Sequence, residues 1–140
     1  EIDFFLVAMP YTLLDQDALA EEFALCSARG VGIVIGAPYA SGILAAGPGE
    51  VPMCRYRPAE PDVIEKVRQM RAVCDRFDVP LKAAALQFPL GHPAVASVIP
   101  GAVSAANVRE NLEMMRRDIP PALWQALKSE RLIDVTAPTP

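Results

Sequence analysis

Short apolar runs alternate with amphipathic stretches along this chain, and this alternation predicts an α/β fold. Residues 3–8, 31–36 and 95–99 are near-continuous runs of apolar side chains, rich in β-branched and aromatic types. Such runs are typical of parallel strands that are covered on both faces. A helical pattern separates the first two runs, so the order strand, helix, strand predicts a right-handed βαβ unit.

The helical stretches are recognised by apolar residues that recur every three or four positions. The first is introduced by Asp15 and Asp17 and closes at Arg29-Gly30, with inward positions predicted at Ala18, Leu19, Phe23, Ala24 and Cys26. A longer helix opens at Pro61 and ends near 77–80, with inward positions predicted at Val63, Ile64, Val67, Met70, Val73 and Cys74. Shorter helices are predicted over 81–90, 104–115 and 120–127.

Residues 37–58 form a long segment that is rich in glycine and proline and shows no sustained period. The segment leaves the carboxyl end of a predicted strand, where long loops commonly serve binding or catalysis. A purely disordered excursion is disfavoured, because the segment contains the apolar anchors Tyr39, Ile43, Leu44, Met53 and Tyr56. We therefore expect this loop to serve binding or catalysis.

The composition limits the classes of partner. The chain has 140 residues, 52% of them hydrophobic, and a net charge of -4 with a pI near 5.0, which disfavours nucleic acid. No apolar run approaches the ~20 residues that span a bilayer, and no signal-peptide pattern is present. We expect a soluble, cytoplasmic protein without membrane or nucleic-acid partners.

The three cysteines and the single histidine indicate no metal site. Cys26, Cys54 and Cys74 are widely spaced, lack a Cys-x-x-Cys pair and are predicted to be free thiols, with Cys26 and Cys74 as small buried side chains. His92 lies between Gly91 and Pro93 and is predicted to be a helix-end residue rather than a general base.

The strand count raises the question of completeness. Three parallel strands leave two open edges, whereas eight strands closed into a barrel leave none, and such a barrel needs about 250 residues. The chain begins at Glu1 and enters an apolar strand almost at once. We therefore predict that residues 1–140 are the C-terminal portion of a (β/α)8 barrel, about its last three βα units. A free-standing α/β binding domain remains an alternative.

The turn after the third strand is a candidate phosphate site. Residues 97–104 run from an apolar strand through Pro-Gly to Ser104, a plausible N-cap of the following helix. Gly101 permits close approach of the backbone to an anion, and the helix would direct its positive dipole end at the turn. The same pattern also occurs in βα loops that bind nothing.

Three segments together carry a resemblance to a known family. Residues 11–16, 32–44 and 97–112 are similar, in this order and spacing, to motifs after the sixth, seventh and eighth strands of the aldo/keto reductases. The resemblance covers essentially the whole chain and places it in the C-terminal half of that fold. Within the family it is nearest to the aldose dehydrogenase branch typified by L-fucose or D-threo-aldose 1-dehydrogenase.

This resemblance implies a nicotinamide cofactor, NAD or NADP, lying across the carboxyl ends of the strands. The residues that it assigns to the pyrophosphate are Ala37, Tyr39, Ser41 and Gly42. Those that it assigns to the adenosine moiety are Gly101, Ser104, Asn107, Glu110 and Asn111. For Glu110 and Asn111, ordinary exposed helix positions are an equally open interpretation.

The sequence also departs from the family pattern. Many members have glutamine near Ala8 and an aromatic residue at Gly36, and both are absent here. Val103 and Asn107 stand where members that prefer NADP commonly carry basic or glutamine side chains, so we expect a preference for NAD. Arg109 argues against this preference, since its guanidinium could reach the 2′-phosphate of NADP.

The resemblance implies hydride transfer between nicotinamide and an aldose or small aldehyde, with this chain supplying the cofactor-binding part. The family's catalytic residues belong to the first half of the barrel, so none is assigned here, not even Tyr11, Tyr39 or Tyr56. The resemblance also implies that residues 37–58 wall the substrate pocket. The partners implied are a small sugar or aldehyde and the missing N-terminal half of the barrel. A noncatalytic cofactor-binding subunit of the same fold, acting in sensing or interaction, is the alternative function.

Overall fold

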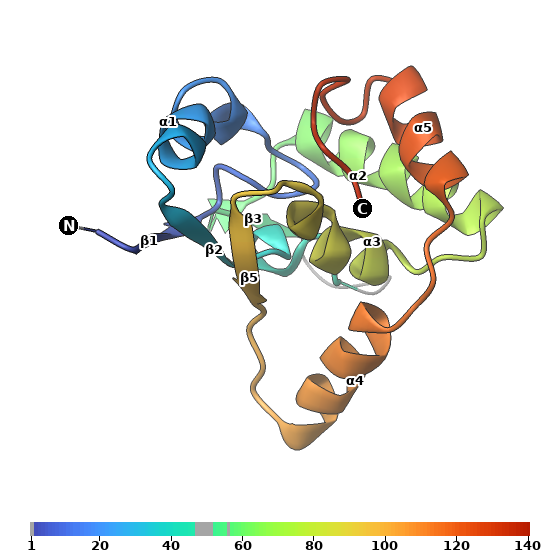
Figure 1. Ribbon diagram of the computed structural model, residues 1–140. Coiled ribbons are helices and arrows are strands. Elements are labelled where there is room, and N and C mark those ends of the chain that lie inside the picture. The colour runs from blue at the N-terminus through green and yellow to red at the C-terminus, as the bar shows by residue number, and fades with distance from the viewer. Residues whose placement is uncertain (1, 47–51, 56) are drawn as a thin grey trace.

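A computed structural model describes residues 2–46, 52–55 and 57–140 of the chain. Its central element is a parallel sheet in which β1 (Phe4–Ala8), β2 (Gly32–Gly36) and β5 (Val95–Ile99) lie in the order β1-β2-β5 (Figure 1). All three predicted strands are confirmed. The central strand, β2, is the one that lies next to both other strands.

The helices follow the predicted pattern with small differences at their ends. A 3-10 turn, η1 (Asp17–Leu19), precedes α1 (Glu22–Ala28), and Gly30 follows with a φ of 66°. The longest helix, α2 (Pro61–Arg76), begins with proline at its first position as predicted. The others are α3 (Leu81–Gln87), which runs into η3 (Phe88–Gly91), then α4 (Ala105–Met115) and α5 (Pro121–Ser129).

Two predicted inward positions are wrong. Ala24 is exposed on α1, because Phe23 alone of that turn faces the core, and Ile64 is 40% exposed at the rim of α2. The other predicted inward residues of these two helices are buried or half-buried. An apolar stripe only gives the mean direction of a helix face, so its margins are decided by the neighbouring elements.

The long segment after β2 contains more structure than its composition indicated. It includes the 3-10 turn η2 (Ala40–Gly42) and an antiparallel pair, β3 (Met53–Cys54) with β4 (Arg57–Pro58). The anchors Tyr39, Ile43 and Leu44 are buried as expected. Tyr56, another predicted anchor, lies outside the described residues.

The core lies between one face of the sheet and the helices. Ile33 and Ile35 of β2 are fully buried on this face, together with the large side chains of α2, α3 and α5. In Figure 1 these three helices gather on one side of the molecule, and α2 packs against both of the others. The opposite face is apolar but open, because Phe4, Leu6 and Ile99 are 60%, 59% and 51% exposed. The expectation that the strands are covered on both faces is therefore wrong within this chain.

The C-terminal segment returns to η3 after α5. A Cβ atom at Gly91 would come within 2.6 Å of the backbone of Thr139, so only glycine permits this approach. The contact fixes the end of the chain beside the entrance to β5. Within the described residues, no helix is both long and apolar enough to cross a membrane.

Candidate functional site

The turn after β2 and helix α4, which follows β5, meet through a buried hydrogen bond between side chains. The Tyr39 hydroxyl donates to Oδ1 of Asn111 at 2.7 Å, and the two residues are 8% and 7% exposed. Nδ2 of the same asparagine donates a longer bond, 3.4 Å, to the carbonyl of Gly101. The Asn111 amide is therefore held at both ends, and it joins three of the residues predicted to bind the cofactor.

The sequence left open whether Glu110 and Asn111 are ordinary exposed helix residues, and the structure excludes this for Asn111. It is the one buried residue of α4, so it is not an ordinary exposed helix residue. Glu110 beside it is exposed. A buried polar side chain needs hydrogen-bond partners, which Tyr39 and Gly101 supply.

An ion pair lies next to this hydrogen bond. Lys82 Nζ is 2.7 Å from Oε2 of Glu110 and lies over the ring of Tyr39, 5.3 Å from its centroid. Burial, with a smaller contribution from the Glu110 carboxylate, raises the pKa of Tyr39, so its hydroxyl stays protonated and acts as a donor. The sequence analysis missed Lys82. Its one signal was that it is the single charged residue of a largely apolar helix.

The N-terminus of α4 is capped as predicted. The Ser104 hydroxyl accepts a bond from the backbone N–H of Asn107 at 3.1 Å. Asn107 makes a second bond at this end of the helix, in which its Oδ1 accepts from the N–H of Val103 at 3.3 Å. Gly101 and Ser104 are exposed, and a Cβ at Gly101 would meet no atom within 4 Å. The positive end of the helix dipole therefore opens on accessible surface.

The turn after β2 has an unusual backbone. Ala37, Ala40 and Ser41 have φ values of 51°, 48° and 61°, and Gly42 follows with 98°. Non-glycine residues rarely adopt this left-handed region, and such strain gathers at functional sites. A Cβ at Gly42 would meet no atom within 4 Å, so the surface there is open. The four residues predicted to flank a pyrophosphate thus lie on one tight turn.

The nine predicted residues form two connected groups. Tyr39 of the turn after β2 is linked to Gly101 through Asn111 and to Glu110 through Lys82. Ser104 and Asn107 form the adjacent helix cap. Ala8 and Gly36, where the family pattern is broken, are register partners at the ends of β1 and β2. The nine assignments to a cofactor stay predictions.

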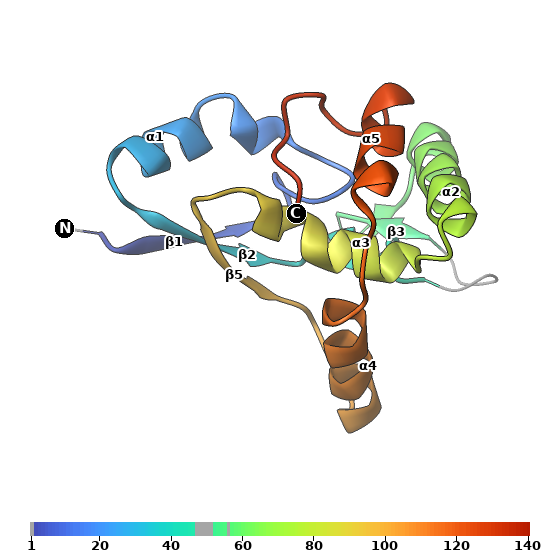
Figure 2. The ribbon, with the colours of Figure 1, turned by 45° about the vertical axis from the view of Figure 1, so that its right-hand side comes forward.

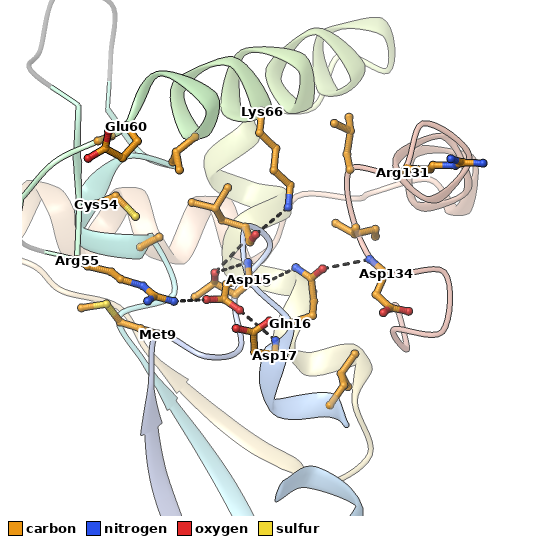
Figure 3. Close-up of a pocket in the computed structure, with 18 of the residues that line it drawn as sticks. Met9, Asp15, Gln16, Asp17, Cys54, Arg55, Glu60, Lys66, Arg131 and Asp134 are labelled. Carbon is orange, nitrogen blue, oxygen red and sulfur yellow. Dashed lines mark hydrogen bonds and ion pairs between the residues drawn. The ribbon is translucent and has the colours of Figure 1, made fainter. Parts of the chain in front are cut away.

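A separate cleft of about 1170 Å³ opens at the carboxyl end of β1 (Figure 3). It is lined by the loop after β1, the β3–β4 pair, the first half of α2 and the segment after α5. None of the nine residues predicted to bind the cofactor lines this cleft. Ala40, which lies in the same turn after β2 but is not one of the nine, does line it. The expectation that the loop after β2 walls a pocket agrees with Cys54, Arg55 and Pro58 in the lining.

The polar groups of this cleft are largely paired with one another. Arg55 is 2.6 Å from Asp15, and Lys66 donates to the carbonyl of Leu14 at 3.0 Å. Gln16 connects the wall to the C-terminal segment, since its Oε1 accepts from the N–H of Asp134 at 3.1 Å (Figure 3). Burial lowers the pKa of Lys66, and the charges of Asp15 and Asp17 oppose this shift.

The remaining candidates have structural roles. Tyr11 is fully buried against Phe23 and Phe88, and its hydroxyl has no hydrogen-bond partner among the described residues. His92 ends η3 as predicted, and its Nδ1 accepts from the N–H of Ala94 at 3.2 Å. The three cysteines are free, with Cys74 buried. Within the described ranges, no group of three acidic, histidine or cysteine side chains is arranged to hold a metal.

Curated relatives match nearly the whole chain. Pyridoxal 4-dehydrogenase of Microbacterium luteolum is 39% identical over 133 residues, which are 95% of this chain and 39% of that protein. D-threo-aldose 1-dehydrogenase of a Pseudomonas species is 36% identical over 141 residues, which are 100% of this chain and 42% of that protein. The chain therefore spans about two fifths of the length of these relatives.

Solved structures give the same picture. The apo form of an aldo-keto reductase from Bacillus halodurans has a TM-score of 0.67 and 27% identity, and 94% of this chain matches 44% of that one. Its holo form has a TM-score of 0.63 and 25% identity, with 94% and 43% covered. The model of the aldo/keto reductase family matches residues 1–130. This chain belongs to the aldo/keto reductase family.

Proposed function

We propose that the protein containing this chain is an NAD(P)-dependent oxidoreductase that transfers a hydride between nicotinamide and an aldose or small aldehyde. Membership of the aldo/keto reductase family supports the reaction class. The names of two relatives, a D-threo-aldose dehydrogenase and a pyridoxal dehydrogenase, support small carbonyl or hemiacetal substrates. The observation that carries the proposal is the pairing of Tyr39 with Asn111, which joins the turn after β2 to α4, the two segments predicted to hold the cofactor.

We further propose that residues 1–140 are the C-terminal part of one barrel domain. The open face of the sheet supports this proposal, since parallel sheets are normally covered on both faces. Phe4 and Leu6 of β1 and Ile99 of β5 would then point into the barrel, where side chains from the other strands would bury them. Adding neighbours to the sheet would also remove the open edge at β1.

The residues present fit a dinucleotide. Gly42 and Gly101 leave open space where a side chain would stand, and the capped N-terminus of α4 offers a positive dipole end to an anion. Val103 and Asn107 place no cation beside this cap, which favours NAD over NADP. Arg109 is exposed nearby on the same helix, and its guanidinium is the group that would favour NADP.

In the proposed reaction, a bound nicotinamide supplies or accepts a hydride at the carbonyl or anomeric carbon of the substrate. The turn at Ala37, Ser41 and Gly42 would position the pyrophosphate by its backbone, and α4 would position the adenosine end. No residue of this chain is assigned the proton transfer, which falls to the remainder of the barrel.

Binding and turnover of the protein in its full encoded length test this function. We expect NADH to bind with micromolar affinity, and NAD-dependent oxidation of fucose, galactose, arabinose or pyridoxal to follow. A kcat/KM that is higher with NADP than with NAD would contradict the cofactor preference. Binding of NADH without turnover of any aldose or aldehyde would favour a noncatalytic cofactor-binding subunit.

A further inference from the structure

Polar contacts attach helix α4 to the rest of the molecule, together with the half-buried Met114 and Met115 at its C-terminal end. In Figure 2 it extends away from the other helices and lies nearest to α3. Its apolar residues Val108 and Leu112 are exposed, and only Asn111 is buried. From α3, Gln87 donates to the carbonyls of Met114 and Arg117 at 2.7 and 2.8 Å, at the far end of the helix.

Lys82 makes the corresponding attachment in the middle of α4. It is the one charged residue of α3, where Leu81, Ala83, Ala84, Ala85 and Leu86 are all buried. Its ammonium group pairs with Glu110 and lies over the ring of Tyr39, and its side chain is only 15% exposed. Lys82 therefore contacts both Tyr39, which is predicted to flank the pyrophosphate, and Glu110, which is predicted to flank the adenosine moiety.

The position of Lys82 is unfavourable for the helix that carries it. A cation in the first turn lies at the positive end of the helix dipole, where acidic residues are preferred. Its compensation comes from outside α3, through the carboxylate of Glu110 and the face of the Tyr39 ring. The lysine is therefore explained by what it does for these two residues and not by the stability of α3.

We propose that Lys82 is a positioning residue for the adenosine end of the dinucleotide, which it serves by fixing Glu110 and the ring of Tyr39. The ring in turn orients the Asn111 amide through the 2.7 Å hydrogen bond. The inference rests on the proposed function, because it assumes that a dinucleotide binds along the turn after β2 and α4. Lys82 contacts no ligand in this proposal and acts through its two neighbours.

Ligand binding to the protein in its full encoded length tests the role of Lys82. Lys82→Met keeps the aliphatic stem and removes the charge, and we expect it to weaken NADH binding about tenfold. ADP-ribose, which contains the adenosine end, is expected to lose affinity by the same factor. Reduced nicotinamide mononucleotide, which lacks that end, is expected to bind unchanged. In turnover, the KM for NAD rises whereas kcat does not change.

Matched variants separate positioning from a general loss of structure. Lys82→Arg is expected to restore affinity, because a guanidinium can pair with Glu110 and stack on Tyr39. Lys128→Ala removes a cation from the last turn of α5 and is expected to change no ligand affinity. Lys82→Gln repeats the test should Lys82→Met fail to fold, as judged by thermal unfolding.

The outcomes distinguish this inference from the function on which it rests. Unchanged NADH affinity in Lys82→Met or Lys82→Gln overturns the role of Lys82 alone. Equal weakening of NADH and the mononucleotide also overturns it, because the effect is then not confined to the adenosine end. Failure of the unmodified protein to bind NADH overturns the proposed function and the inference together.

Discussion

Helices α4 and α5 are neighbours in the sequence and are held in different ways. Helix α5 buries Leu123, Trp124 and Leu127 in the core, whereas α4 buries only Asn111 and leaves Leu112 exposed. Packing of α5 contributes to folding because it removes apolar surface from water. The polar contacts of α4 contribute little net free energy, but they fix the direction of side chains. Under the proposed function, α5 would supply stability and α4 would position the ligand.

Truncation of one leucine on each helix tests this division most strongly. Leu127→Ala is expected to lower the free energy of unfolding by about 3 kcal/mol, because Leu127 is fully buried. Leu112→Ala is expected to change it by less than about 0.5 kcal/mol in a chain where that residue stays exposed. Urea denaturation measures both. Equal costs in the full-length protein would mean that another part of the barrel covers α4.

Removal of one hydroxyl at a time compares paired with unpaired tyrosines. Tyr39→Phe leaves Oδ1 of Asn111 buried without its donor and is expected to cost about 1–2 kcal/mol. Tyr11→Phe is the matched control, since its buried hydroxyl has no partner among the described residues, and it is expected to be neutral or stabilising. Chemical denaturation measures both. A larger loss for Tyr11→Phe would indicate a partner that lies outside the described residues.

The cap of α4 gives a smaller effect. Ser104→Ala removes the acceptor for the N–H of Asn107 and is expected to cost about 1 kcal/mol. The control is Ser27→Ala, at an exposed position within α1, where we expect almost no change in thermal unfolding. If the cap also serves an anion, Ser104→Ala will weaken NADH binding as well. Unaltered affinity would separate the cap from the ligand.

The smallest expected effect is on the pH dependence of stability, and it concerns His92. Burial lowers the pKa of His92, and its Nδ1 must be unprotonated to accept from Ala94. The unfolded chain therefore binds this proton more readily, so stability falls as the pH drops through the unfolded pKa of about 6.5. His92→Asn keeps an acceptor without titrating near neutral pH. We expect it to flatten the dependence of Tm on pH between 7 and 5, and an unchanged profile would contradict this assignment.

The local elements of this protein were determined by the sequence. Strands β1, β2 and β5, the N-cap at Ser104 and the proline starts of α2 and α5 all occur where residue pattern and capping chemistry predicted them. These features depend on interactions within a few residues, which a single sequence displays directly. The family could also be predicted from the sequence, because three motifs occur along the chain in the family's order and spacing.

The tertiary structure decided which side chains meet. Asn111 is buried and faces Tyr39, and Lys82 lies between Tyr39 and Glu110. These contacts depend on how α3, α4 and the turn after β2 pack together. An amphipathic pattern gives a helix face but not the element that the face contacts, so it could not show that Leu112 points away from this core. These contacts join residues that are 28 to 72 positions apart, so they carry no local signal, and only the folded chain shows them.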